Sequence, residues 1–148
     1  MFCRLLAGDG PASWIQRGET ASALLPRHAT WPGHTLVISN EHAVGVHDAS
    51  PEALQGVALL IQQLAQRLTD ALGSTGVNVL NASGAGSGQS VDHLHFHVVP
   101  RWPEDGMDLW PHGQESTRTL DDTWAEQVRA GLAGGGAAEP HQATRLGG

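Results

Sequence analysis

The sequence contains no lysine and no tyrosine, and it has a single cysteine, Cys3, among its 148 residues. Without lysine there is no P-loop lysine, no Schiff-base or pyridoxal-phosphate lysine and no lysine-adenylate ligase chemistry. Without tyrosine, no phenol can act as an acid, a base or a nucleophile. A single cysteine excludes an internal disulfide and any zinc cluster that needs two cysteines of this chain.

Charged residues are also scarce, at 16%, and the formal net charge is −7 with the nine histidines counted as neutral. A protein that binds duplex nucleic acid usually needs a cationic face, and eight scattered arginines do not make one. The sequence contains no run of about 18 apolar residues, the length that a membrane-crossing helix needs. The N-terminus turns polar too early for a signal peptide. We therefore expect a cytoplasmic protein that binds neither a nucleic acid duplex nor a membrane, whereas a small anionic substrate is compatible with a locally electropositive site.

One long helix dominates the predicted secondary structure. Ser50 is a good N-cap, Pro51 fits the first helical position, and Gly73 supplies the C-terminal stop. Apolar side chains between them recur at steps of three and four, which predicts a helix over 51–72 with one apolar face. That stripe consists of Leu54, Val57, Ile61, Leu64, Leu68 and Leu72.

Short strands and a second helix complete an expected α+β fold. Turn-forming residues separate short runs of apolar and β-branched side chains, a pattern typical of strands. The glycine- and alanine-rich residues 133–148 have no apolar period, which predicts a disordered tail after one domain of residues 1–132. We expect strands at 13–17, 20–25, 35–39, 77–81 and 91–99, the first two forming a hairpin, and a last helix at 120–132.

The predicted strand at 91–99 carries histidines at alternate positions. Because successive side chains of a strand point to opposite faces, His93, His95 and His97 share one face, about 6.6 Å apart. Buried imidazoles are costly without partners, so three in a row indicate a site. An accidental polar face, a zinc site and phosphoryl chemistry all fit the pattern. Three such positions span roughly 13 Å, so a zinc ion could bind only two of them, together with another histidine.

Phosphoryl chemistry is the interpretation that also uses the neighbouring sequence. A neutral imidazole is a nucleophile at pH 7, and a second imidazole can handle charge and protons. The glycine-rich loop 83–88 comes just before the histidines, and its backbone N–H groups can hold an anion without lysine. Gln89 and Ser90 add neutral donors, and a Pro-Gly turn brings His34 to the start of another strand.

These motifs resemble the histidine triad (HIT) superfamily over roughly residues 2–115. The sequence is similar to the hydrolase branches, since the uridylyltransferase branch has glutamine at the position of His97. The resemblance implies a HIT-like antiparallel sheet of about five strands with helices, in a homodimer. The motifs are Pro-Gly-His-Thr-Leu-Val-Ile at 32–38, Asn-Glu-His at 40–42, Gly-Val-Asn at 76–78 and Gly-Gln-Ser-Val-Asp-His-Leu-His-Phe-His-Val-Val-Pro-Arg at 88–101.

The resemblance also implies roles for individual residues. His95 would attack the α-phosphorus of a nucleoside phosphate and form a nucleotidyl-histidine that water then cleaves, with no metal or other cofactor. His97 would hydrogen-bond the phosphate and neutralise charge, and His93, supported by His34, would set the tautomer and position of the triad. Contacts with the phosphate or leaving group would come from Gln89, Ser90, Gly88 and Asn81. Part of the base pocket would be formed by Phe2, Leu5 and Leu24.

Departures from the family pattern leave alternatives open. The family usually places an aspartate that holds the ribose hydroxyls before the Pro-Gly-His motif, and residues 24–28 contain no carboxylate. A nucleotide-binding module with little turnover therefore remains an alternative, as does a metalloenzyme that uses His-x-His. Some bacterial members carry zinc ligands near the N-terminus, but Cys3 stands alone, so we expect that set to be incomplete. We expect His42 and His47 to be solvated surface residues.

Overall fold

The computed structural model describes residues 1–29, 31–109 and 123–134. The chain divides into two compact units, Met1–Leu109 and Trp110–Gly148. In the second unit the described part is helix α3 (Thr123–Gly134), which confirms the predicted last helix from residue 123 onward. The helix runs through residues 133 and 134, which the sequence assigned to the tail, while residues 120–122 and 135–148 lie outside the described residues.

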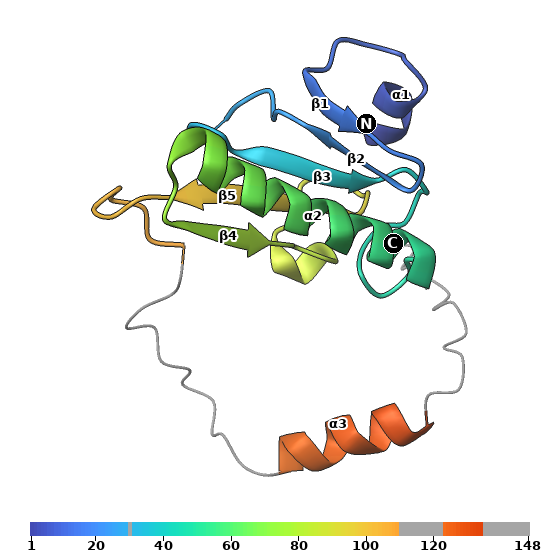
Figure 1. The fold of residues 1–148 in the computed structure, drawn as a ribbon. Helices are drawn as coiled ribbons and strands as arrows, with labels where there is room; N and C mark the ends of the chain where they lie inside the picture. The colour runs from blue at the N-terminus through green and yellow to red at the C-terminus, as the bar shows by residue number, and fades with distance from the viewer. Residues whose placement is uncertain (30, 110–122, 135–148) are drawn as a thin grey trace, which may run out of the picture. The chain divides into compact units, whose positions relative to one another are not determined.

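Five strands form one antiparallel sheet in the order β1-β2-β3-β5-β4 (Figure 1). The predicted hairpin is present, because the first two strands pair with each other around Gly18 and Glu19. The α+β fold with a five-stranded antiparallel sheet is therefore confirmed. The strands are β1 (Trp14–Arg17), β2 (Ala21–Leu24), β3 (Thr35–Ser39), β4 (Gly76–Leu80) and β5 (His95–Arg101).

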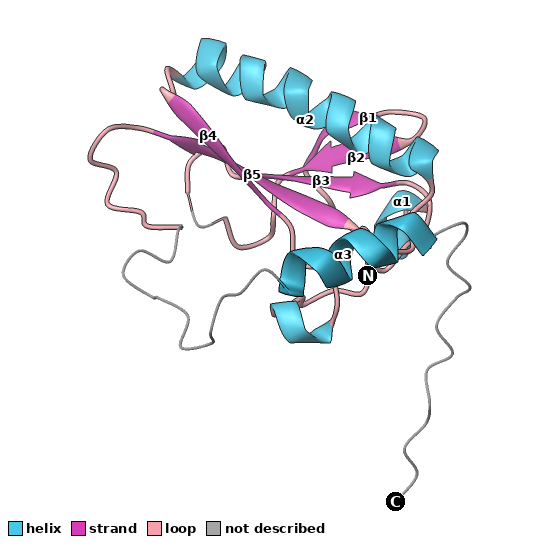
Figure 2. Ribbon diagram, turned by 90° about the horizontal axis from the view of Figure 1, so that it is seen from below, coloured by secondary structure: helices cyan, strands magenta, loops and turns pink. Residues whose placement is uncertain are grey.

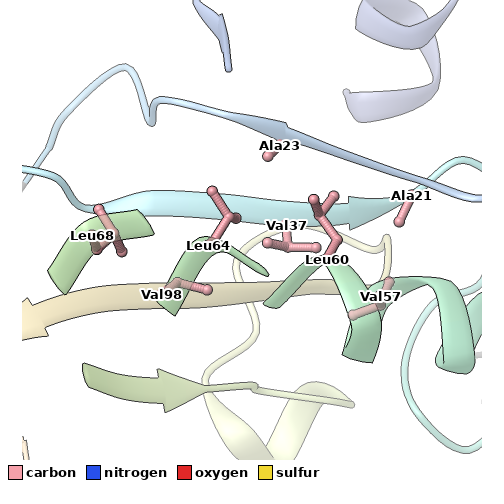
Figure 3. Packing of buried hydrophobic residues seen from close by; sticks show 8 residues of the cluster. All are labelled: Ala21, Ala23, Val37, Val57, Leu60, Leu64, Leu68 and Val98. Atoms are coloured by element: carbon pink, nitrogen blue, oxygen red, sulfur yellow. The ribbon is translucent and has the colours of Figure 1, made fainter. Parts of the chain in front are cut away.

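Helix α2 (Pro51–Leu72) lies along one face of the sheet (Figure 2). Its bounds follow the predicted signals: the Ser50 hydroxyl accepts from the Ala53 amide at 3.1 Å, and Gly73 adopts φ +65°. No helix in the described parts of the chain is long and apolar enough to span a bilayer. The core between this helix and the sheet contains Ala21, Ala23, Val37, Val57, Leu60, Leu64, Leu68 and Val98 (Figure 3).

The opposite face of the sheet carries the histidines and a short helix, α1 (Phe2–Leu6), that the sequence did not predict. Five residues are too few to show helical periodicity. The strand register aligns Leu36 with His97 and Ile38 with His95, so these apolar side chains share a face with the imidazoles. A second buried cluster on this face consists of Phe2, Leu24, Leu36 and Ile38.

Strand β5 does not have the bounds predicted from the sequence. It covers His95–Arg101 rather than 91–99, and His93 lies in a bend before it. The bend forms because the His93 amide donates to the Val91 carbonyl at 2.8 Å, which turns the chain out of the sheet. Pro100, which we expected to end the strand, lies inside it. His93 is thus positioned by a turn, whereas His95 and His97 are positioned by the strand.

Candidate active site

The ring of His95 is held by a backbone hydrogen bond. Its Nδ1 atom lies 2.7 Å from the His93 carbonyl oxygen, and its side chain is buried. A carbonyl oxygen only accepts, so Nδ1 carries the proton, and in the neutral ring the lone pair lies on Nε2. A neutral His95 therefore presents a nucleophilic nitrogen at a fixed orientation.

The ring of His97 lies beside His95, with centroids 5.3 Å apart. Its Nδ1 atom is 2.9 Å from Nε2 of His34, just before β3. Burial, followed by the nearby His95 and His34, lowers the pKa of His97 to about 4, and burial also lowers the pKa of His34. Both rings are therefore neutral at pH 7. In the tautomer in which Nε2 of His34 donates to Nδ1 of His97, the His97 proton lies on Nε2, where it can bond to a substrate oxygen.

His93 faces a different environment from the other two histidines of the triad. Its Nε2 atom lies 2.8 Å from the Ser39 carbonyl oxygen, which leaves the lone pair on Nδ1. That Nδ1 atom points toward Cys3 and His42. His93 contacts His95 through its backbone carbonyl, and the observed support of His34 goes to His97. The contact between His34 and His97 was not predicted, and the expected support of His93 by His34 stays a prediction.

Phe2 of α1 covers the flank of two histidines. Its ring centroid lies 5.4 Å from that of His95 and 5.6 Å from that of His93. Leu5 packs at the edge of the same cluster, and Leu24 is buried within it. The three residues predicted for the base pocket are thus together on the histidine face, where Phe2 forms an apolar wall beside His95. Their contact with a base stays a prediction.

The glycine-rich loop is tied down by Gln89. Its Oε1 atom accepts from the Gly84 amide at 2.7 Å, and its Nε2 atom donates to the carbonyls of Val44 at 2.6 Å and Val91 at 2.8 Å. Both amide hydrogens are used, so in this conformation Gln89 shapes the loop. Gly88 adopts φ +78° and is exposed, as is Ser90. Contacts of these three residues with a substrate stay predictions.

Asn81 holds the backbone of the proposed nucleophile. Its Nδ2 atom donates to the His95 carbonyl at 2.8 Å, and its Oδ1 atom accepts from the Ser83 hydroxyl at 2.7 Å. Ser83 in turn accepts from the Val46 amide at 3.0 Å. This chain of bonds joins the loop after β3 to strand β5, so Asn81 has a positioning role that its residue type alone did not indicate.

Cys3, His42 and His93 form a cluster that the sequence did not predict. The Cys3 Sγ atom lies 3.4 Å from Nδ1 of His42 and 3.4 Å from Nδ1 of His93, and the two Nδ1 atoms are 3.3 Å apart. Tetrahedral zinc bonds of the usual lengths separate sulfur and nitrogen by about 3.5 Å and two nitrogens by about 3.3 Å. These three side chains could therefore hold a zinc ion.

This cluster corrects two expectations. Cys3 does not stand alone, and His42, although exposed, contacts two potential ligand residues. Among the described residues, this cluster is the one group in which at least three histidine, cysteine or carboxylate side chains have ligand atoms close enough to hold a metal ion. It contains neither His95 nor His97. The described residues thus bring no third ligand atom close to both His95 and His97, and a metalloenzyme that uses His-x-His stays an untested alternative. His47 is exposed, as expected.

Comparisons with known proteins agree with the geometry. A family model described as the HIT domain matches residues 7–104. The adenosine 5′-monophosphoramidase of Schizosaccharomyces pombe is 30% identical over 134 residues, which is 87% of this chain and 98% of that protein. The crystal structure of a HIT family protein from Bacillus subtilis matches with a TM-score of 0.76 at 28% identity, and the match covers 94% of this chain and 98% of that protein's chain. A zinc-bound histidine triad family protein from Mycobacterium smegmatis matches with a TM-score of 0.69 at 33% identity, and the match covers 89% of this chain and 91% of that protein's chain. The family match spans more than half of the chain, which therefore belongs to the HIT domain family.

Proposed function

We propose that this protein hydrolyses nucleoside phosphates at the α-phosphorus, through a nucleotidyl intermediate on His95. The bond cleaved would be a phosphoramidate, a phosphoanhydride or a phosphoester. The observation that carries the proposal is the 2.7 Å contact between His95 Nδ1 and the His93 carbonyl, because it leaves Nε2 free to attack. Similarity to an adenosine 5′-monophosphoramidase supports a nucleoside phosphoramidate as the first substrate to assay.

The proposed reaction has two displacement steps at phosphorus. Nε2 of His95 attacks phosphorus, the bond from phosphorus to the leaving nitrogen or oxygen breaks, and the leaving group takes up a proton. Water then attacks phosphorus, the bond to Nε2 breaks, and the water returns a proton to the site. Each cycle consumes one water molecule and releases a nucleoside monophosphate and the protonated leaving group.

In this proposal His97 binds the phosphate oxygens. With its pKa lowered to about 4, the free ring is neutral at pH 7 and offers a hydrogen bond rather than a positive charge. A bound phosphate brings negative charge beside the ring and raises the pKa, because an opposite charge favours the protonated form. His97 would then neutralise charge only when substrate is present, and His34 would keep its ring oriented.

The apolar wall formed by Phe2 supports the same chemistry. Phe2 is 2% exposed and packs against His95, so it keeps water from that flank of the nucleophile. In a site of low polarity, hydrogen bonds to a developing charge are stronger than they are in water. The wall would therefore strengthen the contacts that His97 and the loop amides make to the phosphate.

Replacement of His95 tests the proposal. We expect His95→Ala to lower kcat by about three orders of magnitude or more on adenosine 5′-phosphoramidate and on dinucleoside polyphosphates. His47→Ala is the matched control, since His47 is exposed and lies outside the proposed machinery. Mass spectrometry of the quenched wild-type reaction should find the nucleotidyl group on His95. Unchanged turnover in His95→Ala would overturn the assignment.

A second measurement separates the hydrolase from the binding module. Calorimetry with adenosine monophosphate on the wild-type protein should show binding, alongside measurable turnover of the phosphoramidate. Tight binding without turnover would contradict the hydrolase and favour the regulatory module. We further propose that the enzyme acts as a homodimer in the cytoplasm, and light scattering tests the dimer directly.

A further inference from the structure

We infer that Asp48 is a positioning residue for the proposed nucleophile, and that its carboxylate orients and polarises the ring of His95 through two peptide groups joined in series by hydrogen bonds. Asp48 is exposed and lies at the end of the loop 43–48, between β3 and α2. Its effect on the rate rests on the proposed function, whereas its effect on the His95 ring can be measured without a substrate.

The first peptide group is the one that joins His93 to Leu94. Its carbonyl oxygen accepts from Nδ1 of His95 at 2.7 Å, and its N–H donates to the Ala43 carbonyl at 2.6 Å. Because a peptide group is planar, the contact with Ala43 fixes the direction of the carbonyl that holds the ring. The orientation of His95 therefore depends on the position of the Ala43 carbonyl.

The second peptide group joins Ala43 to Val44, and Asp48 holds its other side. The Val44 amide donates to Oδ2 of Asp48 at 2.9 Å, and the Gly45 amide donates to Oδ1 at 2.7 Å. Burial acts to raise the pKa of Asp48, but these two bonds, with help from His47, lower the pKa below its usual value. The carboxylate is therefore ionised at pH 7, and hydrogen bonds to an ionised acceptor are stronger than those between neutral groups.

The three hydrogen bonds of this relay all run in the same direction. Hydrogen bonds aligned in a chain polarise one another, so a negative charge at one end strengthens the bond at the other end. The relay thus connects a carboxylate to the imidazole without direct contact between them. In order, the donors are His95 Nδ1 and the amides of Leu94 and Val44, and the acceptors are the carbonyls of His93 and Ala43 and the carboxylate of Asp48.

The backbone part of the relay is tightly packed, but the Asp48 side chain is not. Nε2 of Gln89 donates to the Val44 carbonyl at 2.6 Å. Gly45 is buried, and an added Cβ there would lie 2.7 Å from Cβ of Ser83. The exposed carboxylate can therefore be replaced without opening a cavity in the core, which makes Asp48 the suitable residue for a test.

The relay favours the reactive form of His95. With its proton on Nδ1 the neutral ring keeps a lone pair on Nε2, whereas the other tautomer cannot attack phosphorus. The ring gains positive charge as Nε2 bonds to phosphorus, and the charge of Asp48, transmitted along the aligned dipoles, stabilises it. Asp48 bonds to backbone amides of the loop, so its loss should slow the attack and leave substrate binding nearly unchanged.

Kinetics on adenosine 5′-phosphoramidate give the first test. We expect Asp48→Ala to lower kcat by about 10- to 100-fold with little change in KM, because a misplaced reacting group is costly even when the substitution is remote. Asp48→Asn keeps an acceptor oxygen without the charge, so its kcat should lie between those of Asp48→Ala and the wild type. Asp70→Ala is the matched control, since it removes an exposed carboxylate from α2.

Nuclear magnetic resonance of the substrate-free protein gives the second test. Correlation spectra of the ¹⁵N-labelled histidine rings should show His95 protonated on Nδ1 in the wild type, with the signal assigned by its loss in His95→Ala. In Asp48→Ala the Nδ1 proton should move upfield, because its hydrogen bond weakens, and the Nε2 nitrogen should shift toward the protonated value. The shift in Asp48→Asn should be smaller, and Asp70→Ala should match the wild type.

The two tests together decide the inference. A lower kcat with unchanged His95 ring signals would overturn it, as would Asp48 variants that match Asp70→Ala in both measurements. Should Asp48→Ala fail to fold, Asp48→Asn has the same two readouts and must show both changes. Unchanged turnover in His95→Ala would contradict the proposed function instead, and the ring signals would still decide whether Asp48 holds His95.

Discussion

Nε2 of His34 and Nδ1 of His97 lie 2.9 Å apart, which joins the start of β3 to the middle of β5 through two side chains. The contact orients the ring that we assign to the phosphate, so His34 is a positioning residue in this proposal. Because His34 acts on the proposed hydrolysis only through the orientation of the His97 ring, its loss should affect kcat more than KM.

Replacement of His34 should therefore slow the reaction without preventing substrate binding. We expect His34→Ala to lower kcat by about 10- to 100-fold with a smaller change in KM, because His97 loses the partner that fixes its tautomer. Steady-state kinetics on adenosine 5′-phosphoramidate measure both constants. His28→Ala is a suitable control, since His28 is exposed on the preceding loop. A kcat that matches the wild type would rule out the positioning role.

The free energy of unfolding should fall as the pH decreases from about 6.5 to about 4. Burial lowers the pKa of His97 from 6.5, the usual value for a histidine side chain, to about 4 in the folded protein. Between these values the unfolded chain binds more protons than the folded one, so acid favours unfolding, and the effect is complete below pH 4. The lowered pKa of His34 acts in the same direction.

Denaturant titrations at pH values above 6.5 and near 4 measure this dependence. In His97→Gln, which has no titrating group at that position, the decrease in unfolding free energy over the same range should be smaller than in the wild type. Equal decreases in the two proteins would show that the His97 ring is not protonated on unfolding in this range. The comparison between variants removes the contribution of the carboxylates, which both proteins share.

Gly33 is required by the turn that delivers His34. It adopts φ +77°, and an added Cβ would lie 2.5 Å from Cδ1 of Leu72 and 2.9 Å from Cγ of Pro100. Gly33→Ala should therefore lower the unfolding free energy by about 1–3 kcal/mol, through backbone strain and overpacking. Gly86→Ala is the matched control, because no atom lies within 4 Å of its added Cβ. Equal thermal stability of the two variants would contradict the steric argument.

Helix α2 shows what local sequence signals can predict. The Ser50 cap, the proline after it and Gly73 set both ends of the helix, and the structure has the same bounds. Each signal acts through hydrogen bonds or dihedral angles within a few residues of itself. The apolar stripe of α2 predicts burial less well at the C-terminal end of the helix, where Leu72 is 44% exposed. Leu72 is the last residue of the helix and lies at the margin of the face that packs on the sheet.

The position of His93 shows where alternation misleads. The pattern of three histidines predicts one regular strand, but the chain bends at residues 91–93 and only His95 and His97 share the strand. The bend depends on backbone hydrogen bonds that the side-chain pattern does not encode. Asn81 and Gln89 illustrate the same limit, since the family resemblance implied that they contact the phosphate or leaving group, and the structure uses their side-chain amides to hold the backbone.

The sequence by itself determined the α+β class, the long helix and the pair of imidazoles at alternate positions of β5, because each follows from periodicity and turn chemistry between near neighbours. Only the tertiary structure decided that His34 contacts His97 and that Cys3 and His42 lie beside His93. These partners are separated by dozens of residues, and their distances depend on how α1 and the loop after β3 pack on the sheet, which no local pattern specifies.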